Sequence, residues 1–125
     1  MLFIDDEVIS ITQNDDAVLE IDLKTSTGDD YEMAEDDVLI LSVRERPTDA
    51  TDLLLSVSSA PGSNRIVLRG EDTKDIAPGY YSYDVQLTSA DGKRYTVLPS
   101  DIDDKKRGKT KNWKNFCVMG EVTYT

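Results

Sequence analysis

Hydrophobic and polar residues alternate strictly between positions 81 and 88, in a stretch that begins with a Pro-Gly turn at residues 78–79. One face of this stretch carries Tyr81, Tyr83, Val85 and Leu87. A period of two in residues that suit a pleated surface predicts a strand with one side in a core and the other in water. The turn residues Asp91 and Gly92 follow, and they predict a tight two-residue hairpin loop. Residues 93–98 are then the returning strand, and we expect the rest of the chain to pack on this hairpin.

Short apolar stretches between turn residues predict the other strands, at 2–4, 8–11, 18–24, 38–44, 53–58, 65–69 and 116–124. We interpret the first two as one broken edge strand, and 38–44 is apolar enough to be covered on both faces. Residues 53–58 favour a strand over a short helix. Residues 14–16 form a turn, Tyr31 and Met33 are expected to fold back under the loop that precedes them, and residues 70–76 suggest one helical turn.

Seven to nine short strands with regular turns and no long helical period predict an all-β protein, an antiparallel β-sandwich of immunoglobulin-like type. The approach through residues 76–79 into a tyrosine-bearing strand suggests a tyrosine corner, in which the hydroxyl of Tyr81 or Tyr83 bonds back to the backbone. A small closed β-barrel is the alternative, because strand number alone does not separate the two. A chain of 125 residues fits a single domain.

Composition narrows the classes of function. The net charge of −11 disfavours nucleic acid and anionic membranes as partners, because both would repel the chain. The sequence has no histidine, which removes the Ser-His-Asp arrangement, and its lone cysteine, Cys117, excludes an intrachain disulfide. We expect Cys117 to be a packed residue. No signal peptide and no membrane-spanning run is apparent, so we expect synthesis in the cytoplasm.

One segment departs from the acidic character of the chain. Residues 101–115 contain six basic and three acidic residues, so the remainder carries −14. The candidate partner-contact residues are Lys105, Lys106, Arg107, Lys109, Lys111, Trp113 and Lys114. Three interpretations remain open for this long basic loop at about 99–115: an exposed loop without a partner, a protein-contact arm, or a nucleic-acid contact. Pairing with the acidic surface of another copy or of a neighbouring protein fits the charge best.

The densest acidic cluster is a candidate calcium site that we interpret as a solvated loop. It comprises Asp29, Asp30, Glu32, Glu35, Asp36 and Asp37, and their spacing does not match an EF-hand loop. A carboxylate pair for glycoside hydrolysis is disfavoured in so small a domain. No glycine-rich phosphate loop is present. We therefore expect no enzyme activity, no cofactor and no metal.

Several motifs occur in a recognisable order. An Asn14-Asp15-Asp16 turn precedes an alternating strand, and Gly28 precedes Tyr31 and Met33. The most distinctive run is Gly79, Tyr81, Tyr83, Asp84 and Val85, continuing to Asp91 and Gly92, with Val122 and Thr123 in the closing strand. This order, over residues 12–125, resembles the immunoglobulin-like domains of tailed-phage structural proteins, especially the amino-terminal domain of the baseplate upper protein family. The chain departs from the pattern of this family in two places. The turn at residues 14–15 lacks the glycine, and a long basic loop replaces what is usually a shorter connection between strands.

The resemblance implies a non-enzymatic virion or prophage protein, a tail, baseplate or head-tail module. Its partners would be other virion proteins or copies of itself, as a homo-oligomer in a particle assembled in the bacterial cytoplasm. Gly79, Tyr81, Tyr83, Asp91 and Gly92 would then be structural. The alternative is a glycan- or calcium-binding β-sandwich module, for which Tyr80, Tyr95 and Trp113 are the candidate exposed aromatic residues.

Overall fold

The computed structural model describes residues 2–5, 8–25, 27–45, 53–98, 103–104, 109–110 and 115–120. Its strands are β1 (Leu2–Asp5), β2 (Val8–Thr12), β3 (Ala17–Glu20), β4 (Val38–Arg44), β5 (Leu53–Ser58), β6 (Arg65–Leu68), β7 (Gly79–Thr88), β8 (Arg94–Leu98), β9 (Asp103–Asp104), β10 (Lys109–Thr110) and β11 (Phe116–Met119). The short helix α1 (Gly70–Thr73) lies between β6 and β7.

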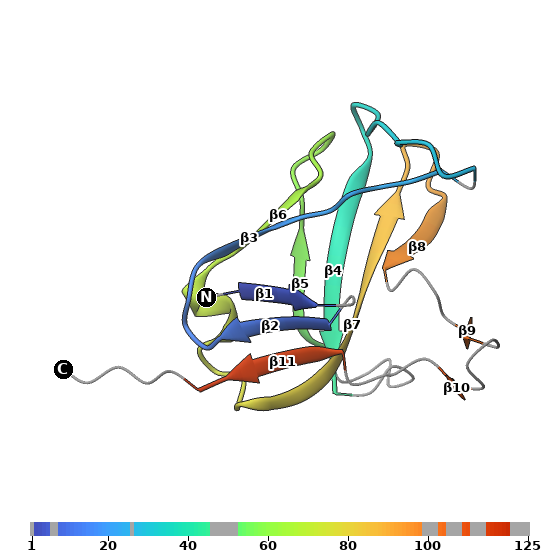
Figure 1. Cartoon of the computed structure of the whole chain (residues 1–125). Helices are drawn as coiled ribbons and strands as arrows, with labels where there is room; N and C mark the ends of the chain where they lie inside the picture. Colours follow the sequence, from blue (N-terminus) through green and yellow to red (C-terminus); the bar gives the residue numbers. More distant parts are fainter. Residues whose placement is uncertain are drawn as a thin grey trace.

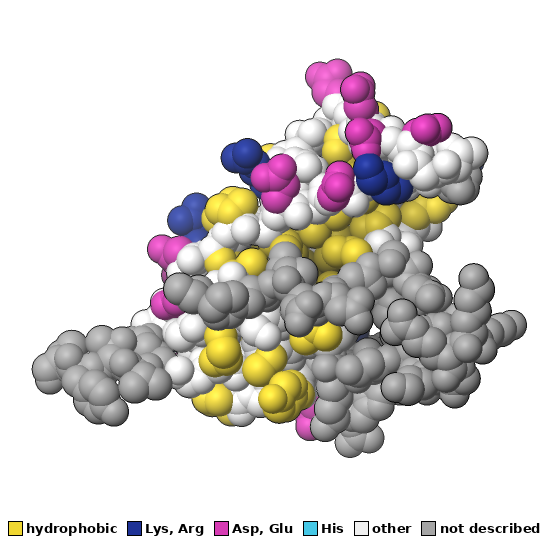
Figure 2. Space-filling model, in the orientation of Figure 1, with side chains coloured by type: hydrophobic (Ala, Val, Ile, Leu, Met, Phe, Trp, Pro, Cys, Tyr) yellow, Lys and Arg dark blue, Asp and Glu magenta, His cyan; other side chains and the backbone are white. Residues whose placement is uncertain are grey.

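Two sheets carry most of this structure (Figure 1). The large sheet has the strand order β1-β2-β11-β7-β4-β5, and β8 also pairs with β7. The second sheet consists of β3 and β6, and β9 pairs only with β10. The segments that follow β3, β5 and β7 lie at one end of the molecule, where acidic side chains are prominent on the surface (Figure 2).

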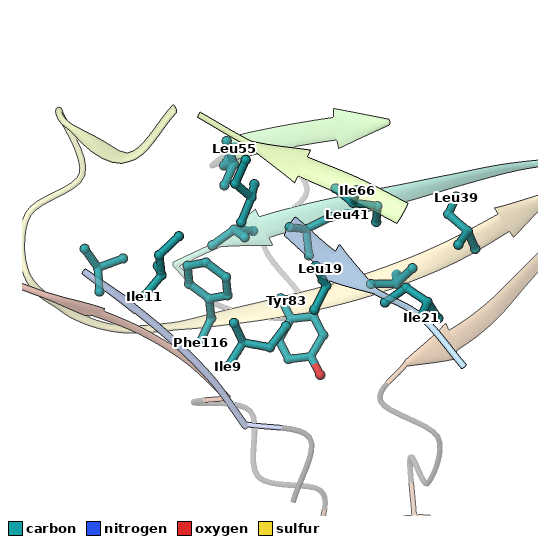
Figure 3. Packing of buried hydrophobic residues seen from close by; sticks show 14 of the residues in the cluster. Ile9, Ile11, Leu19, Ile21, Leu39, Leu41, Leu55, Ile66, Tyr83 and Phe116 are labelled. Atoms are coloured by element: carbon teal, nitrogen blue, oxygen red, sulfur yellow. The ribbon is translucent and has the colours of Figure 1, made fainter. Parts of the chain in front are cut away.

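The hydrophobic core lies between the two sheets. Leu19 of β3 and Ile66 of β6 belong to the same buried cluster as Leu41 of β4, and Figure 3 shows these side chains together. In the same cluster, the rings of Tyr83 and Phe116 meet edge to face with their centroids 6.2 Å apart. Burying each such side chain stabilises the fold by about 1.5–3 kcal/mol, which makes this cluster the main source of stability.

The all-β class is confirmed, since one helical turn is the only helix among the described residues. The described strands form open sheets, so the closed-barrel alternative is wrong for this part of the chain. The prediction of purely antiparallel pairing is also wrong, because β2 and β11 are parallel. Their register pairs Ile9 with Phe116 and Ile11 with Val118, and this register places four buried side chains on the core face.

The amino-terminal strands also differ from their prediction. β1 and β2 pair with each other in antiparallel fashion instead of forming one broken strand. Of these two strands, only β1 lies at an edge of the sheet. β4 has the predicted bounds, but its faces alternate between fully and partly buried. β5 is a strand, as predicted, and Tyr31 and Met33 pack against the core. The strand predicted at 18–24 ends at Glu20, although Ile21 and Leu23 remain buried.

The predicted turn at residues 14–16 holds α1 in place. The amide of Asn14 donates to Thr73 Oγ1 at 2.9 Å, and Asp16 Oδ1 accepts the amide of Gly70 at 2.7 Å. Asn14 has a φ of 69°, in the left-handed region that asparagine tolerates better than most residues. Asparagine therefore adopts the conformation for which a glycine is the usual residue in such a turn.

The central hairpin forms between β7 and β8 as predicted, but its loop is longer than the predicted two residues. The amide of Ser89 donates to the carbonyl of Lys93 at 2.9 Å, and the amide of Gly92 donates to the carbonyl of Ser89 at 2.9 Å. Gly92 has a φ of 85°. This is the three-residue loop in which a β-turn is followed by a left-handed residue, and it requires the glycine that the sequence supplies.

The two tyrosines predicted to line the interior differ in environment. Tyr83 is 4% exposed, whereas Tyr81 is partly buried at the edge of the core. The hydroxyl of Tyr81 donates to the carbonyl of Ala77 at 2.5 Å, which is the backbone contact expected of a tyrosine corner. Gly79 begins β7 and lies opposite Val118 of β11.

Two different strands share one edge of β7, and Asn115 fills the position between them. β8 pairs with β7 from Thr88 to Val85, and β11 pairs with it from Tyr81 to Gly79. At Tyr83, the side chain of Asn115 replaces a strand: its Oδ1 accepts the Tyr83 amide at 2.8 Å, and its Nδ2 donates to the Tyr83 carbonyl at 3.3 Å. The carbonyl of Asn115 also accepts the amide of Ile9 at 2.9 Å.

Replacing Asn115 by alanine tests this role. We expect Asn115→Ala to lower the free energy of unfolding by about 3 kcal/mol, because it leaves the buried amide and carbonyl of Tyr83 without these partners. Urea denaturation followed by circular dichroism measures the loss. Gln86→Ala, which removes a side-chain amide from an only partly buried position of β7, is the control. Equal stability of the two variants would contradict the role of Asn115.

Candidate functional site

Three connections converge at the end of the molecule where β3, β5 and β7 finish. They are the loop of residues 21–37, the turn of residues 59–64 and the hairpin loop of residues 89–93. Backbone bonds tie the second connection to the end of the first and to β4: Gly62 donates to the carbonyl of Asp37 at 2.8 Å, and Ser59 donates to the carbonyl of Leu39 in β4 at 2.7 Å. Figure 1 shows these connections together at the top of the molecule.

Between the loop of residues 21–37 and the β7–β8 hairpin lies a groove of about 1120 Å³, which we call the loop-end groove. Its larger apolar side chains are Leu23, Tyr31, Leu87, Tyr95, Val97 and Leu98. Leu23 and Leu87 are also core residues, whereas Tyr95 is 51% exposed. The groove is therefore an open continuation of the core, with an aromatic side chain accessible on its β8 wall.

Asp37 fixes the loop wall of this groove. The side chain accepts a hydrogen bond from the hydroxyl of Tyr31 at 2.6 Å and another from the amide of Ala34 at 2.9 Å. Asp37 is only 2% exposed. The hydrogen bond to Asp37 raises the pKa of Tyr31, because it favours the protonated phenol, and burial and the charge of Asp37 add to the effect. A buried carboxylate with two donors thus holds Tyr31 against the groove.

Charged side chains at the rim are partly paired with each other. The Lys24 ammonium bonds to Asp30, which raises the pKa of Lys24 and lowers that of Asp30. Lys93 Nζ lies 3.7 Å from Asp91, and a hydrogen bond from the Ser89 hydroxyl is the main cause of a lowered pKa at Asp91.

The loop of residues 27–37 adds further carboxylates and no base. Its exposed acids are Asp29, Asp30, Glu32, Glu35 and Asp36. Figure 2 shows magenta carboxylates at this end above a stretch of yellow hydrophobic side chains. The rim is therefore acidic while the lining below it is largely apolar.

The acidic cluster that we interpret as a solvated loop was also considered as a calcium site. Within the described ranges, no three His, Cys, Asp or Glu side chains are grouped so that they could hold a metal ion. No helix in the same ranges is long and apolar enough to cross a membrane.

The structure describes only some of the predicted site residues, and it does not bring all of these together. Asp91 lines the loop-end groove and Gly92 completes the adjoining turn. Of the predicted contact residues, only the backbone of Lys109 is described, in β10 opposite Asp104. The others lie outside the described residues: Lys105, Lys106, Arg107, Lys111, Trp113 and Lys114. Of the candidate aromatic residues, Tyr95 lines the groove, whereas Tyr80 is 63% exposed and does not.

Sequence reasoning missed the groove and the role of Asp37. Asp37 stands directly before the apolar strand β4, and this position was a usable signal because such a residue lies at the edge of a core. The groove itself joins segments far apart in the chain, from Asp22 to Leu98, and no local pattern marks that juxtaposition.

Comparison of the chain with protein-family models, curated proteins and solved structures gave no match. The resemblance to phage structural domains therefore stays a prediction from the sequence.

Removing the Asp37 carboxylate tests the loop wall. We expect Asp37→Ala to lower the free energy of unfolding by about 2 kcal/mol, because the Ala34 amide and the Tyr31 hydroxyl lose their buried acceptor. Asp36→Ala, at an exposed neighbour, should change it by less than about 0.5 kcal/mol.

The pKa of Tyr31 gives a second readout of the same contact. Because folding raises this pKa, the stabilisation by Tyr31 is complete below the ordinary value of 10.0 and is lost as the pH rises through the folded value. In ultraviolet titration, Asp37→Ala should therefore lower the pKa of one tyrosine. An unchanged titration and an unchanged stability would contradict this role of Asp37.

Proposed function

We propose that the chain is a non-enzymatic structural module of a tailed-phage or prophage particle, a tail, baseplate or head-tail component on an immunoglobulin-like sandwich. It acts by binding copies of itself or other virion proteins. The supporting observation is the strand order of the large sheet, together with the motif order in the sequence that resembles phage immunoglobulin-like domains.

The strand order fits the variable-type immunoglobulin arrangement. In that arrangement, strand G neighbours F, F neighbours C and C neighbours C′, while B and E lie in the opposite sheet. Here β11, β7, β4 and β5 follow one another in the large sheet, and β3 pairs with β6 in the other. Taking β7 as strand F and β6 as strand E, α1 and the residues after it form the E–F corner.

The tyrosine corner supports the same assignment. Tyr81 lies near the start of β7 and bonds back to Ala77, as the corner tyrosine of strand F does. Two residues further on, immunoglobulin domains of antibodies carry the second cysteine of their disulfide. This chain has Tyr83 there, and it packs on Phe116 in the core. Hydrophobic packing at this position would replace the disulfide in a particle assembled in a reducing cytoplasm.

The charge distribution supports assembly contacts as the mode of action. A segment rich in lysine and arginine on an otherwise acidic protein favours electrostatic pairing with a neighbour of opposite surface charge. The basic segment enters between β8 and β11, the two strands that share one edge of β7.

A glycan-binding module is the second candidate, because Tyr95 is exposed in a groove that also contains Tyr31. Aromatic faces beside carboxylates suit a sugar ring and its hydroxyl groups. The acidic rim and the opposite charge of the basic segment favour the assembly role over this candidate.

Mass spectrometry of particles tests the proposed role. Particles banded in a density gradient from an induced culture of the source strain should contain the chain at a fixed ratio to the major tail protein. The chain should also stay with the particles through a second gradient at high salt. Recovery of the chain only in the soluble fraction, with complete particles present, would rule out a virion role.

A further inference from the structure

We propose that the loop-end groove is the receptor for the basic segment, residues 105–114, of a second copy of this chain. The inference rests on the proposed assembly role and names the two surfaces that meet.

The size and lining of the groove suit a peptide segment. Its volume of about 1120 Å³ exceeds the roughly 300–1,000 Å³ of small-molecule sites. The lining combines the apolar side chains of Leu23, Leu87 and Leu98 with Tyr95, which is half exposed on a strand. Such a surface can take an aromatic anchor from a partner, and the basic segment carries Trp113.

The acidic rim of the groove favours an occupant with positive charge. Lys24 and Lys93, the two lysines of the groove, already lie against Asp30 and Asp91. Asp22 adds a further exposed carboxylate to the lining, and the exposed Glu32 and Asp36 adjoin the groove residues Tyr31 and Asp37 in the sequence. A cationic peptide gains attraction from this rim, whereas an anionic one is repelled.

The chain contains one segment of matching chemistry. Residues 105–114 hold six basic residues, one tryptophan and no acid. The segment and the groove are different surfaces of one chain, so two arrangements satisfy the contact. Two copies can exchange segments about a twofold axis, or copies can join head to tail into a ring or a row.

Peptide binding to the complete chain tests the inference. The probe is a fluorescent peptide of residues 103–116, followed by anisotropy. We expect a Kd of about 1–100 μM at low salt, the range of a small charged contact, and at least about tenfold weaker binding at high salt. Replacing the six basic residues of the peptide by glutamine should abolish binding, and replacing Trp113 by alanine should weaken it about tenfold.

Matched variants of the chain locate the binding site. Tyr95→Ser should weaken peptide binding about tenfold, whereas Tyr80→Ser, at an equally accessible tyrosine outside the groove, should leave it unchanged. The double variant Glu32→Gln/Asp36→Asn should weaken binding similarly. Its control is Glu71→Gln/Asp75→Asn, which removes two exposed carboxylates beside α1. Circular dichroism melting confirms that each variant is folded.

Three results would overturn the inference. They are no binding of the peptide, equal loss in the groove variants and their controls, and a strictly monomeric chain by light scattering at low salt and high concentration. Oligosaccharide binding that depends on Tyr95, without peptide binding, would also overturn it in favour of a glycan site. A chain that is present in particles but does not bind the peptide refutes only this inference. A chain that binds the peptide but is absent from particles refutes only the proposed virion role.

Discussion

The bidentate pairing of the Asn115 side chain with the backbone of Tyr83 is the constraint on which the large sheet depends. Along one edge of β7 the neighbouring strand changes from β8 to β11, and the chain leaves at Leu98 and returns at Asn115. Without a partner, the buried amide and carbonyl of Tyr83 would each cost about 1–3 kcal/mol. A side-chain amide offers one acceptor and one donor, so it satisfies both groups at the interruption.

The same residue connects three parts of the molecule. Its backbone carbonyl also accepts the amide of Ile9, so β2, β7 and the start of β11 meet at one buried residue. Directly after it, Phe116 lies opposite Ile9 and packs on the ring of Tyr83. Backbone pairing and core packing therefore support each other here.

The local elements could be predicted from the sequence, whereas long-range pairing could not. Alternation identified β7, β4 and the hairpin, because side-chain direction in a strand is set by position alone. The parallel contact of β2 with β11 joins opposite ends of the chain, and both strands are short apolar runs without a signal for direction. Asn115 carried no signal either, because a buried asparagine in a polar segment cannot be told from an exposed one.

For the candidate site too, local sequence features could be predicted and long-range contacts could not. Sequence identified the acidic loop and the basic segment by composition, and the structure places the acidic loop beside an apolar groove lined by Tyr31 and Tyr95. That groove forms because connections from distant parts of the chain finish at one end of the molecule, a consequence of topology and not of any single motif. Its wall is held by the buried Asp37, so the polar contacts at both Asn115 and Asp37 fix surfaces that the hydrophobic pattern leaves undetermined.

Amide hydrogen exchange at Tyr83 and Ile9, measured by NMR, tests the role of Asn115 most directly. If Asn115 completes the ladder, both amides exchange only through opening of the large sheet, as slowly as the core amides of β4. If both amides exchange as fast as that of Glu32 in the exposed loop, the interruption in the sheet is open and the account is wrong.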